Sequence, residues 1–170
     1  GRPYRATALR ASYQRIMMSA ATSTRLRLDA EHTTLATDSG HDVVLAVGVQ
    51  TISKDFFRHE PPSAFDMERA IDAIEDALTS SRLPHAERGE LVTSEPLLQA
   101  WASSGHPPGT DTQLSLDEVE AIFQRLASAS LGHPGALIGL PQGRAAAAAM
   151  LILRECMHHL GFNSVRILSS

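Results

Sequence analysis

The sequence contains one cysteine, no run of about 20 apolar residues and none of the common nucleotide or nucleophile motifs. With Cys156 alone no intramolecular disulfide can form, which excludes a disulfide-stapled secreted domain and favours a reducing or neutral compartment. The missing apolar run argues against a membrane-spanning helix. The missing Walker, dinucleotide-binding and G-x-S-x-G patterns leave P-loop, Rossmann and serine-hydrolase chemistry without support.

Acidic residues are also missing from the first 28 positions, although the whole chain has a formal net charge of -4. This stretch is rich in arginine, serine and threonine, a composition typical of an organelle transit segment or of a phosphate-binding arm. Arginines on a solvated tail and strand would give the same composition without any role. We expect residues 1–14 to form an arm that binds a protein or RNA, in a mitochondrial protein or otherwise a cytoplasmic one. The arginines of this arm and of the start of the first expected strand are Arg2, Arg5, Arg10 and Arg15.

Neither the eight histidines nor the cysteine forms a pattern that predicts a metal centre or a nucleophile. His158 and His159 are adjacent, so on a helix their side chains point about 100° apart and do not chelate as an i, i+4 pair would. Cys156 lies within an apolar helical stretch, which favours a buried, inert thiol. We therefore expect no catalytic residue, no metal site and no cofactor.

With 170 residues the chain is expected to form one domain of the α/β class. Alternating and apolar runs predict strands, and apolar residues at helical spacing predict helices. Two serines followed three positions later by an acid, Ser63 with Asp66 and Ser115 with Glu118, mark helix starts. The expected strands are 15–19, 24–29, 33–37, 42–48, 91–92 and 164–168, and the expected helices are 51–58, 63–79, 97–102, 115–126 and 143–160.

This order predicts that residues 15–170 form a single actin/hexokinase-like (ribonuclease H-like) lobe, because an antiparallel meander precedes helices that alternate with strands. We expect a mixed sheet of about five strands with helices on both faces. The Ala-rich helix 143–160, ended by Gly161 as its C-cap, is expected to be the most buried helix. Glycine and proline predict a flexible loop near 104–112 and a linker over 132–141.

Three segments in this order resemble the second lobe of the Ppx/GppA family of exopolyphosphatases and guanosine pentaphosphate phosphatases. Residues 44–70 are similar to a family segment of a strand, a short helix with paired aromatics, a Pro-Pro-Ser turn and a long helix. LSLDEVEAIFQRL at 114–126 is similar to the family's LTLEELEALLERL, and 139–167 resembles its Ala-rich helix and closing strand. The resemblance runs from about Ile16 to the C-terminus and implies an actin-like phosphatase lobe.

The resemblance fails where phosphate chemistry is expected. Family members carry an Asp-Ile-Gly-Gly-Gly-Ser-Thr-Glu hairpin at the start of this lobe, in which glycines close on phosphate and the carboxylates serve metal and water. Here both carboxylates and all three glycines are replaced, which removes the implied metal site. A second Gly-Gly-Thr turn, expected after strand 91–92, reads Thr93, Ser94, Glu95, Pro96. The run that corresponds to the hairpin is Met18, Ser19, Ala20, Ala21, Thr22, Ser23, Thr24 and Arg25.

We therefore expect a pseudoenzyme: a non-catalytic Ppx/GppA-like protein that acts as a structural or assembly component of a larger complex. The Arg-rich arm suggests an organellar ribosome or another ribonucleoprotein, with other proteins and RNA as partners. The alternative is a lobe of a phosphatase acting on polyphosphate or guanosine pentaphosphate, with the other lobe supplied in trans.

Overall fold

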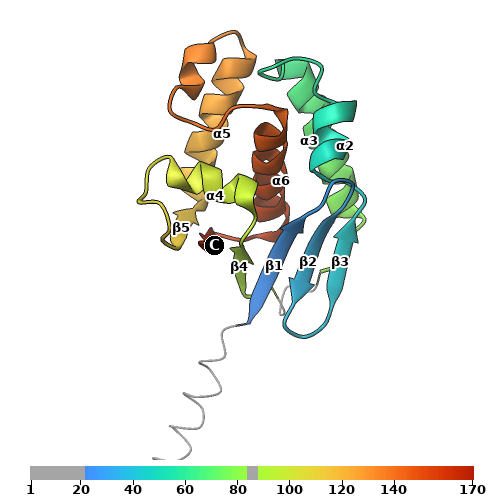
Figure 1. Ribbon diagram of the computed structural model, residues 1–170. Coiled ribbons are helices and arrows are strands. Elements are labelled where there is room, and N and C mark those ends of the chain that lie inside the picture. Colours follow the sequence, from blue (N-terminus) through green and yellow to red (C-terminus); the bar gives the residue numbers. More distant parts are fainter. Residues whose placement is uncertain (1–21, 84–87) are drawn as a thin grey trace, which may run out of the picture.

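The computed structural model describes residues 22–83 and 88–170 (Figure 1). Within these ranges no helix has the length and apolar character that crossing a membrane requires. The elements follow in the order β1 (Ser23–Leu28), β2 (Thr33–Thr37), β3 (Asp42–Leu45), α2 (Val49–Asp55), α3 (Ala64–Thr79), β4 (Glu90–Thr93), α4 (Pro96–Ser103), β5 (Thr112–Ser115), α5 (Leu116–Ser130), the 3₁₀ helix η2 (Pro134–Leu137), α6 (Arg144–Leu160) and β6 (Ser164–Ile167).

The strands form one mixed sheet in the order β3-β2-β1-β4-β6-β5. β1, β2 and β3 pair antiparallel as a meander, β1, β4 and β6 run parallel, and β5 closes the far edge antiparallel to β6. The α/β class, the mixed sheet and the initial meander are thus confirmed.

The sheet has six strands, so the expectation of about five was wrong. The missed strand is β5, which lies where the sequence analysis placed the end of a loop and the cap of the next helix. Its four residues are too few for alternation to show, and their pairing partner β6 lies some fifty positions later. The linker over 132–141 likewise contains the short helix η2. The strand expected at 15–19 lies outside the described residues.

Helix α6 forms the centre of the helical part of the molecule and packs against α2, α3, α4 and α5 (Figure 1). Ala146, Ala147, Ala148 and Ala149 are all buried, because side chains this small let neighbouring helices approach closely. The indole N–H of Trp101 on α4 donates to the Ala146 carbonyl at 2.9 Å. The helix ends as expected at Gly161, whose φ of 74° is the left-handed conformation of a C-cap.

The start of α3 is organised by one buried carboxylate. Asp66, only 2% exposed, completes the expected capping box with Ser63, whose hydroxyl accepts from the Asp66 N–H at 3.1 Å. Its Oδ2 accepts from the backbone N–H groups of Arg58, His59 and Ser63 at 3.1, 3.2 and 3.3 Å, and His59 Nδ1 lies 2.9 Å away. Burial alone would raise the pKa of Asp66, but these hydrogen bonds lower it to about 2.

Replacing Asp66 by asparagine should lower the free energy of unfolding at pH 7 by about 2 kcal/mol, because the amide group cannot accept from several N–H donors as a carboxylate does. The lowered pKa means that the wild-type carboxylate stabilises the fold above its ordinary value of 3.8 and loses this effect as the pH falls toward 2. The difference between wild type and Asp66→Asn, measured by urea unfolding, should therefore shrink over that window.

Asp72→Asn is the matched control, because Asp72 is exposed on the same helix. It should change stability by less than about 0.5 kcal/mol at any pH. Equal effects of the two substitutions at pH 7 would contradict the role assigned to Asp66.

Candidate functional site

The candidate site lies at the edge of the sheet where the parallel strands β1, β4 and β6 end. In open α/β sheets, ligands bind outside the carboxyl ends of parallel strands. Three connections meet this edge: the β1–β2 turn at 29–32, the β4–α4 turn around Glu95, and the residues after β6, Leu168 to Ser170. What this edge can bind depends on which of its backbone groups and charges are free.

The β1–β2 turn is a tight reversal without glycine, made of Asp29, Ala30, Glu31 and His32. The Asp29 N–H donates to the His32 carbonyl at 2.9 Å, and the strands continue in register from the Leu28–Thr33 pair. Among the described residues only glycines have positive φ, and none of those glycines lies at 29–32. The turn therefore lacks the left-handed backbone that arranges successive N–H groups around a phosphate.

Of the residues that the sequence analysis assigned to the phosphate hairpin, the structure describes only Thr22 to Arg25. Met18, Ser19, Ala20 and Ala21 lie outside the described residues, and Thr22 is exposed just before β1. Ser23, Thr24 and Arg25 begin β1. β1 is the first strand of the described sheet, and it pairs with β2 along one edge and with β4 along the other. Because β2 follows β1 and runs antiparallel to it, the first hairpin of the described sheet is the turn at 29–32.

Ser23 and Thr24 are both engaged in contacts within the fold. The Ser23 N–H donates to Asp38 Oδ2 at 2.7 Å, and its hydroxyl bonds the same carboxylate. The buried Thr24 hydroxyl donates to the Arg88 carbonyl. Arg25 is exposed. Because Ser23 bonds to Asp38 and Thr24 to the Arg88 carbonyl, the three residues do not converge on a common point as a ligand site would require.

The start of α2 is hydrogen-bonded to the β1–β2 turn. We call a turn closed when the N–H donors beside it are used within the chain in this way. The N–H of Val49 donates to the Asp29 carbonyl at 3.0 Å, and those of Gln50 and Thr51 donate to the Ala30 carbonyl at 2.8 and 3.1 Å. These are the orphan donors of a helix N-terminus, the groups that anions ordinarily use. Here the turn itself satisfies them. Gly48 makes this contact possible, because a Cβ at that position would lie 2.5 Å from the Asp29 oxygen.

The β4–α4 turn is closed in a similar way, by a side chain. Glu95 Oε1 accepts from the Leu28 N–H at 3.1 Å and so joins the ends of β1 and β4. The Glu95 N–H in turn donates to Thr93 Oγ1 at 3.3 Å, and that hydroxyl donates to the Leu26 carbonyl at 3.0 Å. The sequence shows Glu95 where the resemblance leads us to expect a Gly-Gly-Thr turn, but its contact with Leu28 could not be predicted, because the two residues lie 67 positions apart.

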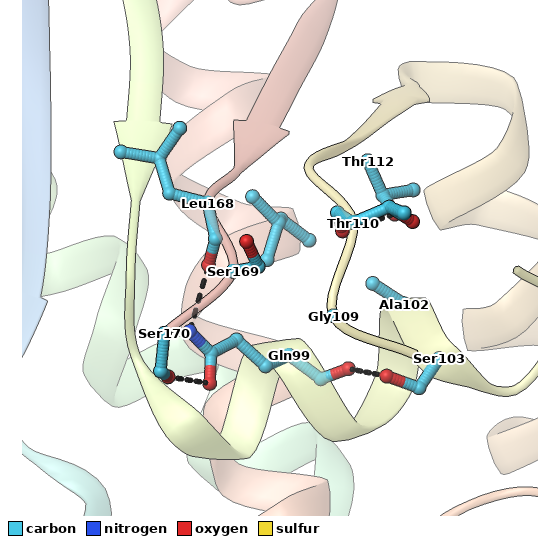
Figure 2. A pocket seen from close by; sticks show the side chains of 10 residues that line it. Gln99, Ala102, Ser103, Gly109, Thr110, Thr112, Leu168, Ser169 and Ser170 are labelled. Atoms are coloured by element: carbon cyan, nitrogen blue, oxygen red, sulfur yellow. Dashed lines mark hydrogen bonds between the residues drawn. The ribbon is translucent and has the colours of Figure 1, made fainter. Parts of the chain in front are cut away.

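The end of β6 borders a cavity of about 180 Å³ whose lining side chains carry no charge (Figure 2). Gln99 on α4 spans its floor: Nε2 donates to the Leu168 carbonyl at 2.7 Å, and Oε1 accepts from the Ser170 hydroxyl at 3.0 Å. Ser103 donates to the Gln99 carbonyl at 2.8 Å. Most polar groups that line the cavity are thus hydrogen-bonded to one another. The lining residues include no pair of nucleophile and base. No sequence pattern pointed to it.

Cys156 is buried in α6, as the sequence predicts. Burial, with a smaller effect of Glu155, raises the pKa of its thiol to about 12. At neutral pH the sulfur therefore stays protonated and unreactive.

No protein-family model matches the sequence, and no curated protein matches it. Solved structures do match it. The Ppx/GppA family member of Aquifex aeolicus is 13% identical with a TM-score of 0.68, over 87% of this chain and 52% of that one. An exopolyphosphatase-like protein is 10% identical (TM-score 0.66, 86% and 55%), and the Cytophaga hutchinsonii exopolyphosphatase is 14% identical (0.57, 92% and 57%).

These matches show the class of fold, a Ppx/GppA-like lobe. The chain spans about half the length of the solved structures that it matches, which is the extent of one lobe. The recognition made from the sequence segments is thereby confirmed at the level of the fold.

The contact at Gly48 gives a direct test of the closed turn. Gly48→Ala should lower the free energy of unfolding by about 1–3 kcal/mol, because the added methyl group must push α2 away from the turn. Gly105→Ala is the control, since a Cβ there meets nothing within 4 Å and Gly105 has no positive φ. Thermal unfolding of both variants measures the difference, and a Gly48 variant as stable as wild type would show that the turn and helix are not in close contact.

Proposed function

We propose that this lobe is non-catalytic and acts as a structural or assembly component of a larger complex. The observation that carries the proposal is the closure of both turns at the carboxyl edge of the sheet. The N–H groups of Leu28, Val49, Gln50 and Thr51 bond to Glu95, Asp29 and Ala30 within the chain. A phosphate would have to break these bonds before it could form its own.

The charge of the edge opposes phosphate as well. Asp29, Glu31 and Glu95 lie on the two turns, and a phosphoryl group carries negative charge that phosphoryl-transfer sites neutralise with cations and N–H donors. One of the Glu95 oxygens, Oε1, already accepts from the Leu28 N–H. The edge therefore suits a structural role better than phosphoryl transfer.

A surface function would use the basic residues that the fold leaves exposed. Arg25 and Arg27 alternate with buried residues on β1. Arg25 pairs with Val92 on β4, and Val92 pairs in turn with Arg166 on β6, so Arg25 and Arg166 lie in one row across the sheet. Arg2, Arg5, Arg10 and Arg15 lie outside the described residues. We propose that the partner is anionic, as RNA is, and that the complex is a ribonucleoprotein such as a mitochondrial ribosome.

A second candidate function follows from the length of the match. The chain spans about half of the Ppx/GppA structures, so a second lobe on another chain would restore their size. In that case the complex, rather than the isolated chain, would hydrolyse polyphosphate or guanosine pentaphosphate.

The isolated chain should release no phosphate from polyphosphate or guanosine pentaphosphate in the presence of Mg²⁺, because its N–H donors are engaged and its turn carboxylates repel the substrate. Phosphate release assayed on the pure chain and on the native complex tests both candidates. Turnover by the pure chain that Ser23→Ala, Thr24→Val or Glu95→Gln abolishes would contradict the non-catalytic proposal, and turnover by the complex alone that Glu95→Gln abolishes would favour the second candidate.

Replacing Arg2, Arg5, Arg10 and Arg15 together by glutamine should reduce incorporation of the chain into its native complex. If RNA is the partner, the affinity should fall with salt at a log–log slope of about 0.7–0.9 per phosphate neutralised. The control replaces Arg58 and Arg82, two exposed arginines elsewhere on the lobe. Unchanged incorporation of the fourfold variant would leave the arm as a targeting remnant and remove the main support for an RNA-linked role.

A further inference from the structure

Three potential metal ligands meet on the side of α6 that faces α3. Glu155 and His159 lie one turn apart on α6, and Glu75 approaches from α3. One ligand atom from each, two carboxylate oxygens and a ring nitrogen, lie within 4.8 Å of one another. This place is distinct from the carboxyl edge of the sheet, and neither the Ppx/GppA resemblance nor the proposed function assigns it a role.

Glu155 forms the buried floor of the cluster. The residue is only 2% exposed, and Arg154 Nη1 donates to its Oε1 at 2.7 Å. Its other oxygen, Oε2, faces His159 Nε2 at 3.6 Å. A carboxylate held in such a place gains from a further cation, because one neighbouring charge does not offset its lost hydration.

The two distances from the His159 ring nitrogen fit metal ligands better than hydrogen-bonded partners. His159 Nε2 lies 3.4 Å from Glu75 Oε1 and 3.6 Å from Glu155 Oε2, both longer than an ordinary hydrogen bond. Zinc bonds its nitrogen and oxygen ligands at about 2.0–2.2 Å, so neighbouring ligands of a tetrahedral zinc ion stand about 3.3–3.6 Å apart. Glu75 and His159 are 42% and 35% exposed, which leaves the ion a path from solvent and room for a water ligand.

Arg154 holds the buried ligand in place from the opposite side. Its guanidinium donates to Glu120 Oε1 on α5 at 2.8 Å and stacks over the Phe123 ring at 3.9 Å from the centroid. The guanidinium is therefore anchored when it bonds Glu155 Oε1, and Oε2 stays directed at His159. Outer groups that orient a ligand in this way accompany most metal sites in proteins.

We propose that Glu75, Glu155 and His159 form a Zn²⁺ site, with Glu75 Oε1, Glu155 Oε2 and His159 Nε2 as ligands and water in the fourth position. The site bridges α3 and α6 and leaves one coordination position open. The two carboxylates offset the charge of a bound Zn²⁺, and the charge of the nearby Arg154 is offset by Glu120.

The test uses the full chain, freed of metal with EDTA, and Zn²⁺ alone as the probe. Competition with a chromophoric chelator should show one Zn²⁺ per chain, and Co²⁺ in its place should give the visible absorption of a tetrahedral centre. Because losing an outer-shell partner already weakens binding about 10–100-fold, Glu75→Gln and His159→Gln should each weaken it at least about 100-fold.

His158→Gln is the matched control. His158 is the next residue on α6, and its Nε2 contacts Glu120 rather than the cluster, so this variant should bind Zn²⁺ as wild type does. Unfolding midpoints in EDTA show whether each variant is folded. An ionic cluster alone, with His159 protonated between two carboxylates, would show no competition with the chelator. That result, or an equal loss in His158→Gln, would overturn the proposal.

Discussion

Helix α6 sets the spacing of the whole lobe, because its buried alanines fix how closely four other helices can approach it. Trp101 on α4 reaches the Ala146 carbonyl, and α2 packs on the same helix. These two helices follow the turns at the carboxyl edge of the sheet, Glu95 standing directly before α4 and Gly48 directly before α2. A larger side chain at Ala146 would push α4 away from α6 and, with α4, the turn that Glu95 belongs to.

This arrangement gives the two ends of the lobe different chemistry. At the carboxyl edge, the donors that a Ppx/GppA-like phosphate site would need are bonded to Asp29, Ala30 and Glu95. On the α3 side of α6, Glu155 and His159 stand one helical turn apart and face an acid of another helix. The two proposals follow from these arrangements: no phosphate binding at the carboxyl edge of the sheet, and a Zn²⁺ site between α3 and α6.

Local patterns predicted much of the fold, whereas features set by distant contacts were missed. Capping boxes at Ser63 and Ser115 lie within four residues, so the sequence shows them directly. Strand β5 depends on pairing with β6, and the position of the first described hairpin depends on β4 occupying one edge of β1. The Glu155–His159 spacing was visible, but Glu75 lies 80 positions before Glu155 and only packing unites them.

The central claim is that the N–H donors at the carboxyl edge of the sheet already have partners within the chain. Backbone amide resonances report on these donors directly. Mg²⁺ and pyrophosphate would be titrated into ¹⁵N-labelled protein while the N–H signals of Leu28, Val49, Gln50, Thr51 and Glu95 are followed. Our account predicts no saturable shifts at these positions, because their donors already have partners within the chain. Saturable shifts confined to these amides would contradict it, since they would mean that the turns open to admit a phosphate.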